Sequence, residues 1–441
     1  MPEMSRSRAE CSIRFRRPHD RGALDIYWSA DSLSARFTTS RGRAVRAPVR
    51  AEATTKPLAA IACGGTGGHL FPGIAVGEEL IRRGCDIMLL VSEKEIDEQA
   101  VKSAYGMRVV ALPAVGLQAG QLGKFVRGFT KSFIAVRRIF NERRPQIVLG
   151  MGGFACAPPI LAGKTLGAAT FLHESNSIPG KANRLLASLV NRVFVGFPQA
   201  GGRLRNERIV VTGTPVRPQF QPRAPEPCRL ALGLDPKRPV LLIMGGSQGA
   251  TAVNAMVLEA VPRLRQSAPE LQFLHLTGPN DEANARAQYA AQKAKAVVHA
   301  FLTEMELAIG AATVVVSRAG ASSLAELAAM QLPAILIPYP TAADNHQFYN
   351  AHAFASAGAA VRLDQSQATG ERLAELVVRL LQDVDYHSDV KRRLAQWHAP
   401  TAASTIADDM LSTTNSKPRA ADFSPPVGIS RAFQPAGITG L

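Results

Sequence analysis

Short apolar runs alternate along most of the chain with longer segments in which apolar residues recur every three or four positions. The short runs have the length of buried strands, and the longer segments have the period of helices that cover a sheet. We therefore predict an α/β fold with two parallel, doubly wound sheets that face a central cleft. The expected strands are 58–63, 87–91, 108–112, 146–149, 169–173 and 192–195 in the first half, and 240–244, 272–276, 296–300, 313–316, 334–337 and 360–363 in the second.

A proline-rich stretch from Pro215 to Pro239 separates the two halves. Proline disfavours helix interiors and central strands, so we expect a join without regular structure there. Both ends of the chain lack sustained periodicity, the first being rich in Arg and Ser and the last in Pro, which predicts disorder. The expected organisation is a disordered extension 1–56, a first domain 57–217, a second domain 218–411 and a disordered tail 412–441. The last helix is a candidate to pack back on the first domain.

The 441-residue chain is 46% hydrophobic and 20% charged, as is typical of globular proteins, and it has no apolar run long enough to cross a bilayer. Its five cysteines form no Cys-x-x-Cys pair, which argues against a zinc site and a disulfide framework and favours a reducing compartment. The net charge of +16 suits nucleic acid, anionic lipid or a phosphorylated substrate without choosing among them. Either an organelle-targeting peptide or a start codon assigned too far upstream explains the basic extension.

Glycine-rich loops follow three of the expected strands, at Gly64–His69, Gly150–Gly153 and Gly245–Gly249. Backbone amides free of side chains and a helix N-terminus together form a site for phosphate. The first two loops belong to one sheet, so they should open onto the same crevice and could grip one diphosphate together. The third loop lies in the other half and could hold a second diphosphate. The alternative for the first loop is a tight turn needed only for packing.

Polar side chains follow other strands. His173 opens a run ending at Asn176, and it is either functional or a structural histidine. In the second half, Ser322 or Ser323 is a candidate N-cap that would place Glu326 in the first turn of a helix. A carboxylate there is favoured by the helix dipole, but it can also accept hydrogen bonds from ribose hydroxyls. Residues 344–350 offer neutral donors and acceptors that suit a sugar better than a metal ion.

A helix is expected over residues 122–144, with an apolar stripe beside basic residues. Such a stripe usually packs on a sheet. The phenylalanines and cations near its start are better explained by contact with an anionic lipid surface. The expected membrane face comprises Leu122, Lys124, Phe125, Arg127 and Phe129.

In this combination and order, the motifs resemble those of glycosyltransferase family 28, in particular the bacterial transferases that add N-acetylglucosamine (GlcNAc) to undecaprenyl-diphospho-N-acetylmuramoyl-pentapeptide. That step converts lipid I to lipid II in peptidoglycan synthesis. The resemblance spans roughly residues 57–411, and it rests on seven motifs. These are Gly64–Gly73, Gly150–Gly153, His173–Asn176, Gly213–Arg217, Gly245–Gly249, Arg318–Ala321 with Glu326, and Asp344–Gln347 with Asn350 and Ala351.

The resemblance implies a GT-B fold, with two Rossmann-like domains that bind a lipid-linked acceptor and UDP-GlcNAc. It assigns the donor to Thr66, Gly67, Gly68, Asn176, Arg217, Ser247, Leu302, Ala321, Ser322, Ser323, Leu324, Ala325, Glu326 and Gln347. Leu302 would lie against uracil, Glu326 would take the ribose hydroxyls and Gln347 would reach the sugar. Gly65, Gly152 and Gly153 would face the acceptor diphosphate. Two residues depart from the family pattern, which usually has Gln at Ser175 and Asn at Thr214.

By the same resemblance, the reaction is a single displacement with inversion that needs a base for the acceptor's C4 hydroxyl. His69 is the candidate, because imidazole titrates near working pH, and its alternative role is to anchor the loop. Arg217, Ser247 and helix N-termini would stabilise the departing diphosphate, so we expect no metal and no cofactor.

The expected partners are UDP-GlcNAc, lipid I and an anionic membrane surface, with other cell-wall enzymes as further candidates and no nucleic acid. The expected location is the cytoplasmic face of the inner membrane. Three alternatives stay open at this point: a GT-B enzyme that glycosylates diacylglycerol or another lipid, a UDP-sugar epimerase, and a non-catalytic protein that binds polyanions.

Overall fold

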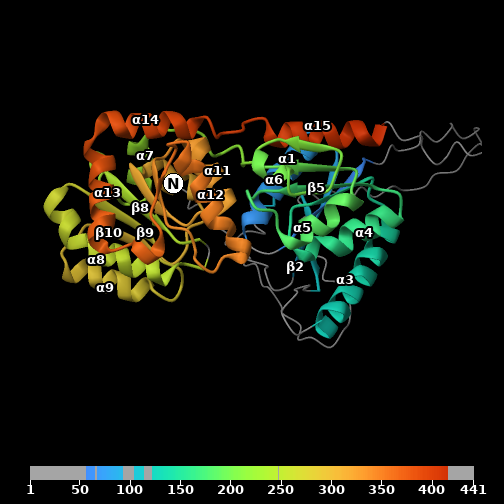
Figure 1. The fold of residues 1–441 in the computed structure, drawn as a ribbon, viewed down its shortest axis with the longest axis horizontal. Coiled ribbons are helices and arrows are strands. Elements are labelled where there is room, and N and C mark those ends of the chain that lie inside the picture. Colours follow the sequence, from blue (N-terminus) through green and yellow to red (C-terminus); the bar gives the residue numbers. More distant parts are fainter. Residues whose placement is uncertain (1–55, 65–66, 93–103, 114–121, 247, 416–441) are drawn as a thin grey trace, which may run out of the picture.

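The computed structural model describes residues 56–64, 67–92, 104–113, 122–246 and 248–415. These residues form two α/β lobes side by side, each with its own parallel sheet (Figure 1). The predicted fold class is therefore confirmed. Most of the extension expected to be disordered lies outside the described residues, as does the tail from residue 416.

The first lobe contains a seven-stranded sheet in the order β3-β2-β1-β4-β5-β6-β7. Its strands are β1 Leu58–Cys63, β2 Asp86–Ser92, β3 Arg108–Leu112, β4 Ile147–Gly150, β5 Ala169–Glu174, β6 Arg192–Val195 and β7 Ile209–Val211. Every pair in this sheet is parallel. Successive residues of β1 face opposite layers, so Ala60 packs beneath α3 Leu122–Glu142 and α4 Ala157–Thr165, while Ile61 packs beneath α1 Gly67–Arg82. Short helices α5 Lys181–Leu186 and α6 Pro198–Gly201 complete the lobe.

The second lobe contains a six-stranded parallel sheet in the order β10-β9-β8-β11-β12-β13. Its strands are β8 Val240–Met244, β9 Gln272–Leu276, β10 Ala296–His299, β11 Val314–Ser317, β12 Ala334–Leu336 and β13 Val361–Arg362. Its helices are α7 Pro225–Ala231, α8 Thr251–Ser267, α9 Glu282–Ala291, α10 Met305–Ala311, α11 Ala321–Met330, α12 His346–Ser356, α13 Gly370–Gln382 and α14 Val384–Ala395. Apolar side chains from these helices bury both faces of the sheet.

The last helix, α15 Ala402–Asn415, returns to the first lobe and lies along α1 (Figure 1). Ile406, Ala407 and Met410 are fully buried in the same core as Ile61. Arg83, directly after α1, pairs with Asp408, and Arg192 of β6 pairs with Asp409. The C-terminal helix therefore completes the first lobe rather than the second.

Several sequence-based expectations were wrong in detail. The stretch 215–239 is not free of regular structure, because α7 begins at Pro225 and proline is tolerated in a first helical turn. Phe220, Cys228 and Leu234 from this stretch are core residues of the second lobe. The strand β7 was missed, since three residues that are half-buried or exposed carry little periodic signal. Residues 412–415, expected to be part of a disordered tail, belong instead to α15, which continues to Asn415.

Shortening a buried side chain of α15 should destabilise the first lobe. We expect Met410→Ala to lower the free energy of unfolding by about 2–5 kcal/mol, measured by urea denaturation, because it leaves a cavity in a packed core. The matched control is Val384→Ala on α14, where the side chain is 73% exposed and the change should stay within about 0.5 kcal/mol. Equal effects of the two substitutions would show that α15 does not share the core.

Candidate functional site

A cavity of about 740 Å³ lies between the two lobes. Most of its lining comes from the segments at the carboxyl ends of β8, β10, β11 and β12, and Gly68 and Phe71 of α1 close it from the first lobe. β8 and β11 are neighbours in the sheet whose onward connections run in opposite directions, which makes this the topological switch point of the second lobe. Open α/β sheets bind ligands at such a point. β1 and β4 form the corresponding pair in the first lobe.

The first two glycine loops are in contact at that pair. A side chain at Gly64 would lie 2.9 Å from the carbonyl oxygen of Gly152, so only glycine lets the loops approach this closely. Gly152 and Gly153 have φ values of 127° and 76°, in the region that favours glycine. The two loops therefore lie against each other in the described part, while a crevice shared by both stays a prediction. Gly65 and Thr66 lie outside the described residues, whereas Gly67 begins α1.

His69 lies in the first turn of α1, and its ring is packed against Gly152. Its Nδ1 is buried with no hydrogen-bond partner, while the ring has a backbone hydrogen bond with Met151. Burial lowers the pKa of His69 below its usual value, the Glu174 carboxylate opposes this shift, and His346 adds to it. The imidazole is therefore favoured in its neutral form, which has a free acceptor nitrogen.

His173 is fully buried at the end of β5. Its Nε2 lies 3.1 Å from the carbonyl oxygen of Gly213, and its Nδ1 lies 3.2 Å from the hydroxyl of Ser175. Since the carbonyl only accepts, Nε2 carries the proton and Ser175 donates to Nδ1. Burial lowers the pKa of His173 to about 4. Of the two roles considered for His173, functional or structural, these contacts favour the structural one. Ser175 holds the ring through its hydrogen bond to Nδ1.

Glu174 organises the loop that follows β5. Its Oε1 accepts from the backbone and side-chain amides of Asn176 at 2.9 and 3.2 Å, and its Oε2 accepts from Gly180 and Asn183 at 2.9 Å. A buried carboxylate with four donors is well compensated, because each hydrogen bond replaces one lost to water. The carboxylate thus fixes the side chain of Asn176, whose oxygen faces Asn350 at 3.1 Å.

Glu326 lies on α11 with its side chain in the cavity lining and only 8% exposed. Burial raises the pKa of Glu326 to about 7, Glu306 adds to the shift, and Arg217 opposes it. The helix begins at Ala321 after an N-cap at Gly320, so neither Ser322 nor Ser323 is the cap, and Glu326 lies in the second turn. The helix dipole therefore does not account for a carboxyl group at this buried position. A ligand with hydroxyl donors would account for it, because the hydroxyl groups would supply hydrogen-bond partners.

Arg217 is buried between the lobes, with its guanidinium 4.4 Å from the ring centre of Phe71 and 5.1 Å from that of Phe220. Its Nε has no hydrogen-bond partner, although Glu78 and Glu326 both interact with its charge. A buried cation with an unused donor, stacked on a ring that lines the cavity, is suited to a ligand phosphate.

Gln347, at the start of α12, has a fixed amide. Its Oε1 accepts from the backbone amides of Ala319 and Tyr339 at 3.3 and 3.0 Å. These two hydrogen bonds use the amide oxygen and leave the amide nitrogen as a donor, and the residue lines the cavity. Gln347 can consequently donate to a ligand hydroxyl.

The remaining expected donor residues fall into three groups. Gly68, Leu302, Ser322 and Ser323 line the cavity, as do Gly245, Gly246, Gln248 and Gly249 of the third glycine loop. The side chains of Ala321 and Leu324 are instead buried in the core of the second lobe, and Ala325 is half-buried on the same helix. Ser247 lies outside the described residues.

Some lining residues were missed by the sequence analysis. Arg318 was seen as part of a motif but given no role, although its guanidinium donates to the carbonyl oxygens of Ile337 and Pro338 and lies under Tyr339. Tyr339 itself is 47% exposed at the cavity. Its position two residues after the expected strand 334–337 was the available signal, because ligand-binding loops follow strands.

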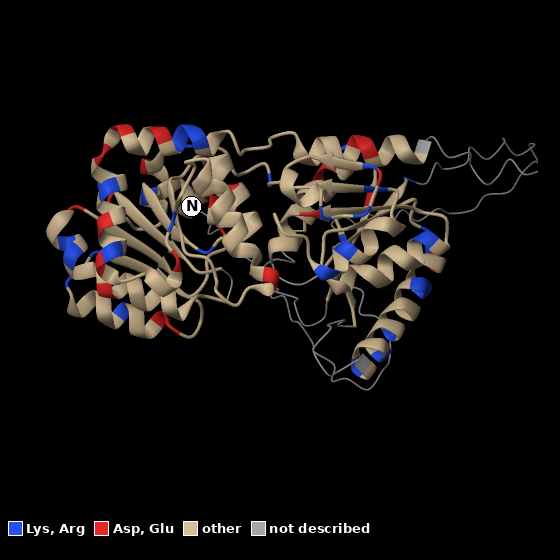
Figure 2. Cartoon of the chain, viewed as in Figure 1, with Lys and Arg blue, Asp and Glu red and all other residues tan. Residues whose placement is uncertain are grey.

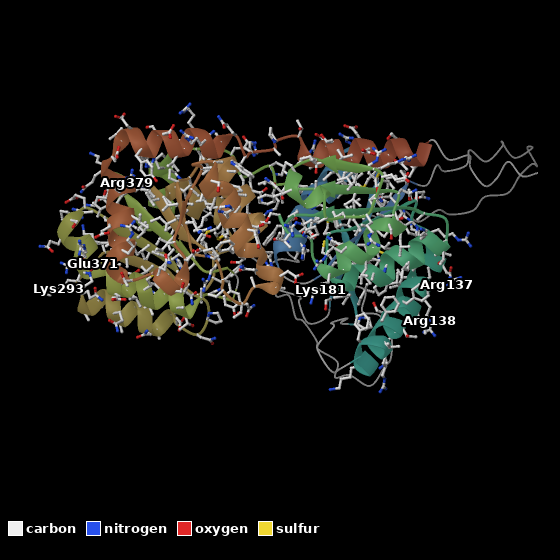
Figure 3. The ribbon with its side chains drawn as sticks, in the orientation of Figure 1. Arg137, Arg138, Lys181, Lys293, Glu371 and Arg379 are labelled. Atoms are coloured by element: carbon white, nitrogen blue, oxygen red, sulfur yellow. The ribbon has the colours of Figure 1, made fainter. Side chains whose placement is uncertain are left out.

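Helix α3 extends from the body of the first lobe, and Lys and Arg side chains run along it (Figure 2). Lys124 and Arg127 are exposed, whereas Phe125 packs edge-to-face on Phe154 at 5.4 Å and also contacts Phe129. Arg137 and Arg138 project from the same helix, away from the second lobe (Figure 3). The side chain of Leu122 lies outside the described residues. The apolar side chains of this surface are thus partly covered by their neighbours and less available to lipid than the sequence pattern indicates. Its exposed side chains are basic.

Within the described ranges there is neither a membrane-spanning helix nor a cluster of metal ligands. No helix there is both long and apolar enough to cross a membrane. No three or more His, Cys, Asp and Glu side chains lie close enough together there to hold a metal ion.

Comparison with known proteins matches residues 59–195 to the glycosyltransferase family 28 N-terminal domain and residues 240–406 to the family 28 C-terminal domain. The chain is 36% identical over 363 residues to a protein of Citrifermentans bemidjiense and 38% identical over 361 residues to one of Sorangium cellulosum. Each alignment covers 80% of this chain, with 98% and 87% of the respective relatives. Both relatives are named UDP-N-acetylglucosamine--N-acetylmuramyl-(pentapeptide) pyrophosphoryl-undecaprenol N-acetylglucosamine transferase.

Among solved structures, MurG of Acinetobacter baumannii superposes with a TM-score of 0.63 at 26% identity, over 81% of this chain and 99% of that one. A UDP-N-acetylglucosamine 2-epimerase superposes with a TM-score of 0.60 at 14% identity, over 82% and 98%, which shows a shared fold alone. With both family domains matched in order and whole-length relatives above 30% identity, the chain belongs to glycosyltransferase family 28.

Proposed function

We propose that this protein is an inverting hexosyltransferase that moves GlcNAc from UDP-GlcNAc to the C4 hydroxyl of the N-acetylmuramoyl residue of undecaprenyl-diphospho-N-acetylmuramoyl-pentapeptide. One observation carries the proposal. The cavity joins a glycine loop and helix N-terminus of the second lobe to Gly68 and Phe71, which flank His69 in α1 of the first lobe, in a chain whose relatives are named for this reaction. A donor and an acceptor could therefore meet there.

On the donor side, the cavity lining supports a specific placement. The N-terminus of α8 and the described residues of the loop before it, Gly245, Gly246, Gln248 and Gly249, offer backbone amides to a diphosphate. Leu302 offers an apolar contact for uracil, and Glu326 offers two oxygens to ribose hydroxyls. Gln347 would donate to the sugar, while Arg217 and the helix N-termini would stabilise the departing UDP in place of a metal ion.

On the acceptor side, the proposal assigns the diphosphate to the backbone of Gly152 and Gly153, beside the ring of His69. The acceptor hydroxyl would attack the anomeric carbon as the bond to UDP breaks, and its proton would pass to the free Nδ1 of His69. Three observations support this choice: the unpartnered nitrogen, the lowered pKa of His69, and the carboxylate of Glu174 nearby, which would favour the imidazolium that forms.

For location, we propose attachment to an anionic membrane surface through α3, on the cytoplasmic face where UDP-GlcNAc is available. The exposed cations Lys124 and Arg127 lie at the tip of this helix, and the row of rings from Phe125 leads to Phe154 beside the loop Gly150–Gly153. A lipid-linked acceptor could thus reach the cavity from the bilayer.

The direct test is transfer of labelled GlcNAc from UDP-GlcNAc to purified lipid I. We expect transfer by the wild type, and a loss of about 10²–10⁴-fold in kcat for His69→Ala with little change in donor affinity, because the base acts only in the transition state. His352→Ala is the control, since this histidine is exposed on α12 outside the cavity lining. A folded wild type that binds donor but transfers nothing would refute the proposal.

Donor binding should depend on pH through Glu326. Ribose hydroxyls donate to the ionised carboxylate, so binding lowers a pKa that is about 7 in the free protein and the affinity rises with pH through that value. Lowering the pH from 8 to 6 should weaken UDP-GlcNAc binding roughly tenfold by calorimetry, since one proton then competes with the ligand. Glu326→Gln should bind more weakly at pH 8 and lose this pH dependence. An unchanged slope in that variant would assign the titration to another group.

Charge reversal on α3 should weaken membrane binding. We expect Lys124→Glu with Arg127→Glu to reduce co-sedimentation with phosphatidylglycerol-containing vesicles by at least about tenfold, because each cation near such a surface contributes about 1 kcal/mol. The control with the same change in net charge is Lys237→Glu with Lys391→Glu, two exposed positions of the second lobe. Equal losses in both proteins would mean that overall charge, rather than α3, attracts the lipid.

A further inference from the structure

One carboxamide joins the two lobes next to the cavity. Asn350 of α12 is fully buried, and both ends of its amide are satisfied. Its Oδ1 accepts from the backbone amide and the hydroxyl of Ser177, each at 2.9 Å. Its Nδ2 donates to the side-chain oxygen of Asn176 and to the carbonyl oxygen of Ala319, each at 3.1 Å. Three of these four hydrogen bonds cross from the second lobe to the first.

The two segments that Asn350 connects both carry candidate site residues. In the first lobe, Asn176 is held by Glu174, whose carboxylate interacts with His69. In the second lobe, the backbone amide of Ala319 donates to the side-chain oxygen of Gln347, a residue of the cavity lining. A chain of hydrogen bonds therefore runs from Glu174, whose charge acts on the proposed base, to the proposed sugar-binding amide. Within it, the hydrogen bond between Asn350 and Asn176 joins the two lobes.

We propose that Asn350 is a positioning residue that sets the acceptor-side loop of the first lobe against the donor-side loop of the second, at the separation that group transfer requires. The proposal rests on the proposed transferase function. Attack of a hydroxyl on an anomeric carbon needs the two reacting atoms within a narrow range of distance and angle, and a displacement of about 1 Å can cost on the order of a hundredfold in rate.

Other contacts between the lobes would hold them together without setting this alignment. Phe197, which follows β6, packs on Phe354 and Trp397 with ring centres 6.1 and 5.7 Å apart. Apolar packing of this kind is not directional. The ion pair between Arg184 and Asp344 is substantially exposed, with 42% and 32% of the side chains accessible, so its contribution is small. A variant at Asn350 should accordingly fold with both lobes in contact.

The kinetic test compares Asn350→Ala, Asn350→Asp and the wild type in the transfer of GlcNAc to lipid I. Both variants should lose about 10- to 100-fold in kcat, with the Kd for UDP-GlcNAc within about threefold, since a donor bound by the second lobe does not need the alignment. Asn350→Asp matters because it keeps the volume and the bonds from Ser177 while placing an acceptor against Asn176 and Ala319. Unchanged kcat, or a loss confined to the Kd for UDP-GlcNAc, would overturn the proposal.

The matched control is Asn206→Ala. Asn206 also donates to two carbonyl oxygens, those of Ala187 and Val190, and accepts from a backbone amide, that of Arg208, but all of these lie within the first lobe. Its loss should lower the Tm without lowering kcat. If Asn206→Ala and Asn350→Ala reduce kcat equally, the effect is general destabilisation and the positioning role fails.

A second measurement does not depend on catalysis. Spin labels on cysteines introduced at Arg203 and Gln288, exposed positions of the two lobes, report the distribution of distances between the lobes. We expect this distribution to broaden in Asn350→Ala and to stay unchanged in Asn206→Ala. An unaltered distribution in Asn350→Ala would overturn the proposal even if transfer were lost. A wild type that transfers nothing would instead refute the proposed function and leave Asn350 to be judged by these distances.

Discussion

Parallel strand pairing is the constraint on which the rest of this structure depends. In each lobe the connections from two central neighbouring strands run in opposite directions, β1 with β4 in the first sheet and β8 with β11 in the second. The helices that follow these strands cover opposite faces of each sheet, which leaves room for a ligand at its carboxyl edge. The cavity between the lobes lies at the carboxyl edge of the second sheet, where Gly68 and Phe71 of the first lobe close it.

Charged groups in the cavity lining and beside it favour a ligand that combines hydroxyl groups with negative charge. Glu326 is protonated more readily than an ordinary carboxyl group, and Arg217 retains a buried donor without a partner. Each group is costly to bury in the free protein, and each would gain a partner from the ribose and diphosphate of a nucleotide sugar. A solved epimerase shares the fold, but its low identity carries no further information about substrate.

Much of the architecture could be predicted from sequence because buried parallel strands have a strong signal. The strands β1, β3, β6, β8 and β9 match their expected bounds, since each is a short apolar run bounded by turns or helical periods. β7 was missed because it is an edge strand with little burial. The roles of His173 and Ser175 depend on Gly213, forty residues away from the histidine, and such long-range contacts leave no local trace. The tilt of Phe125 toward Phe154 was unpredictable for the same reason.

The return of α15 to the first lobe has a mechanical consequence. The chain crosses between the lobes twice, once between β7 and α7 and again between α14 and α15 (Figure 1). These two connections form a two-point hinge. They permit rotation of one lobe relative to the other about the line that joins them, and they restrict rotation about other axes. Opening for nucleotide exchange would thus follow one preferred path, and closure would bring the same two loops back into register each time.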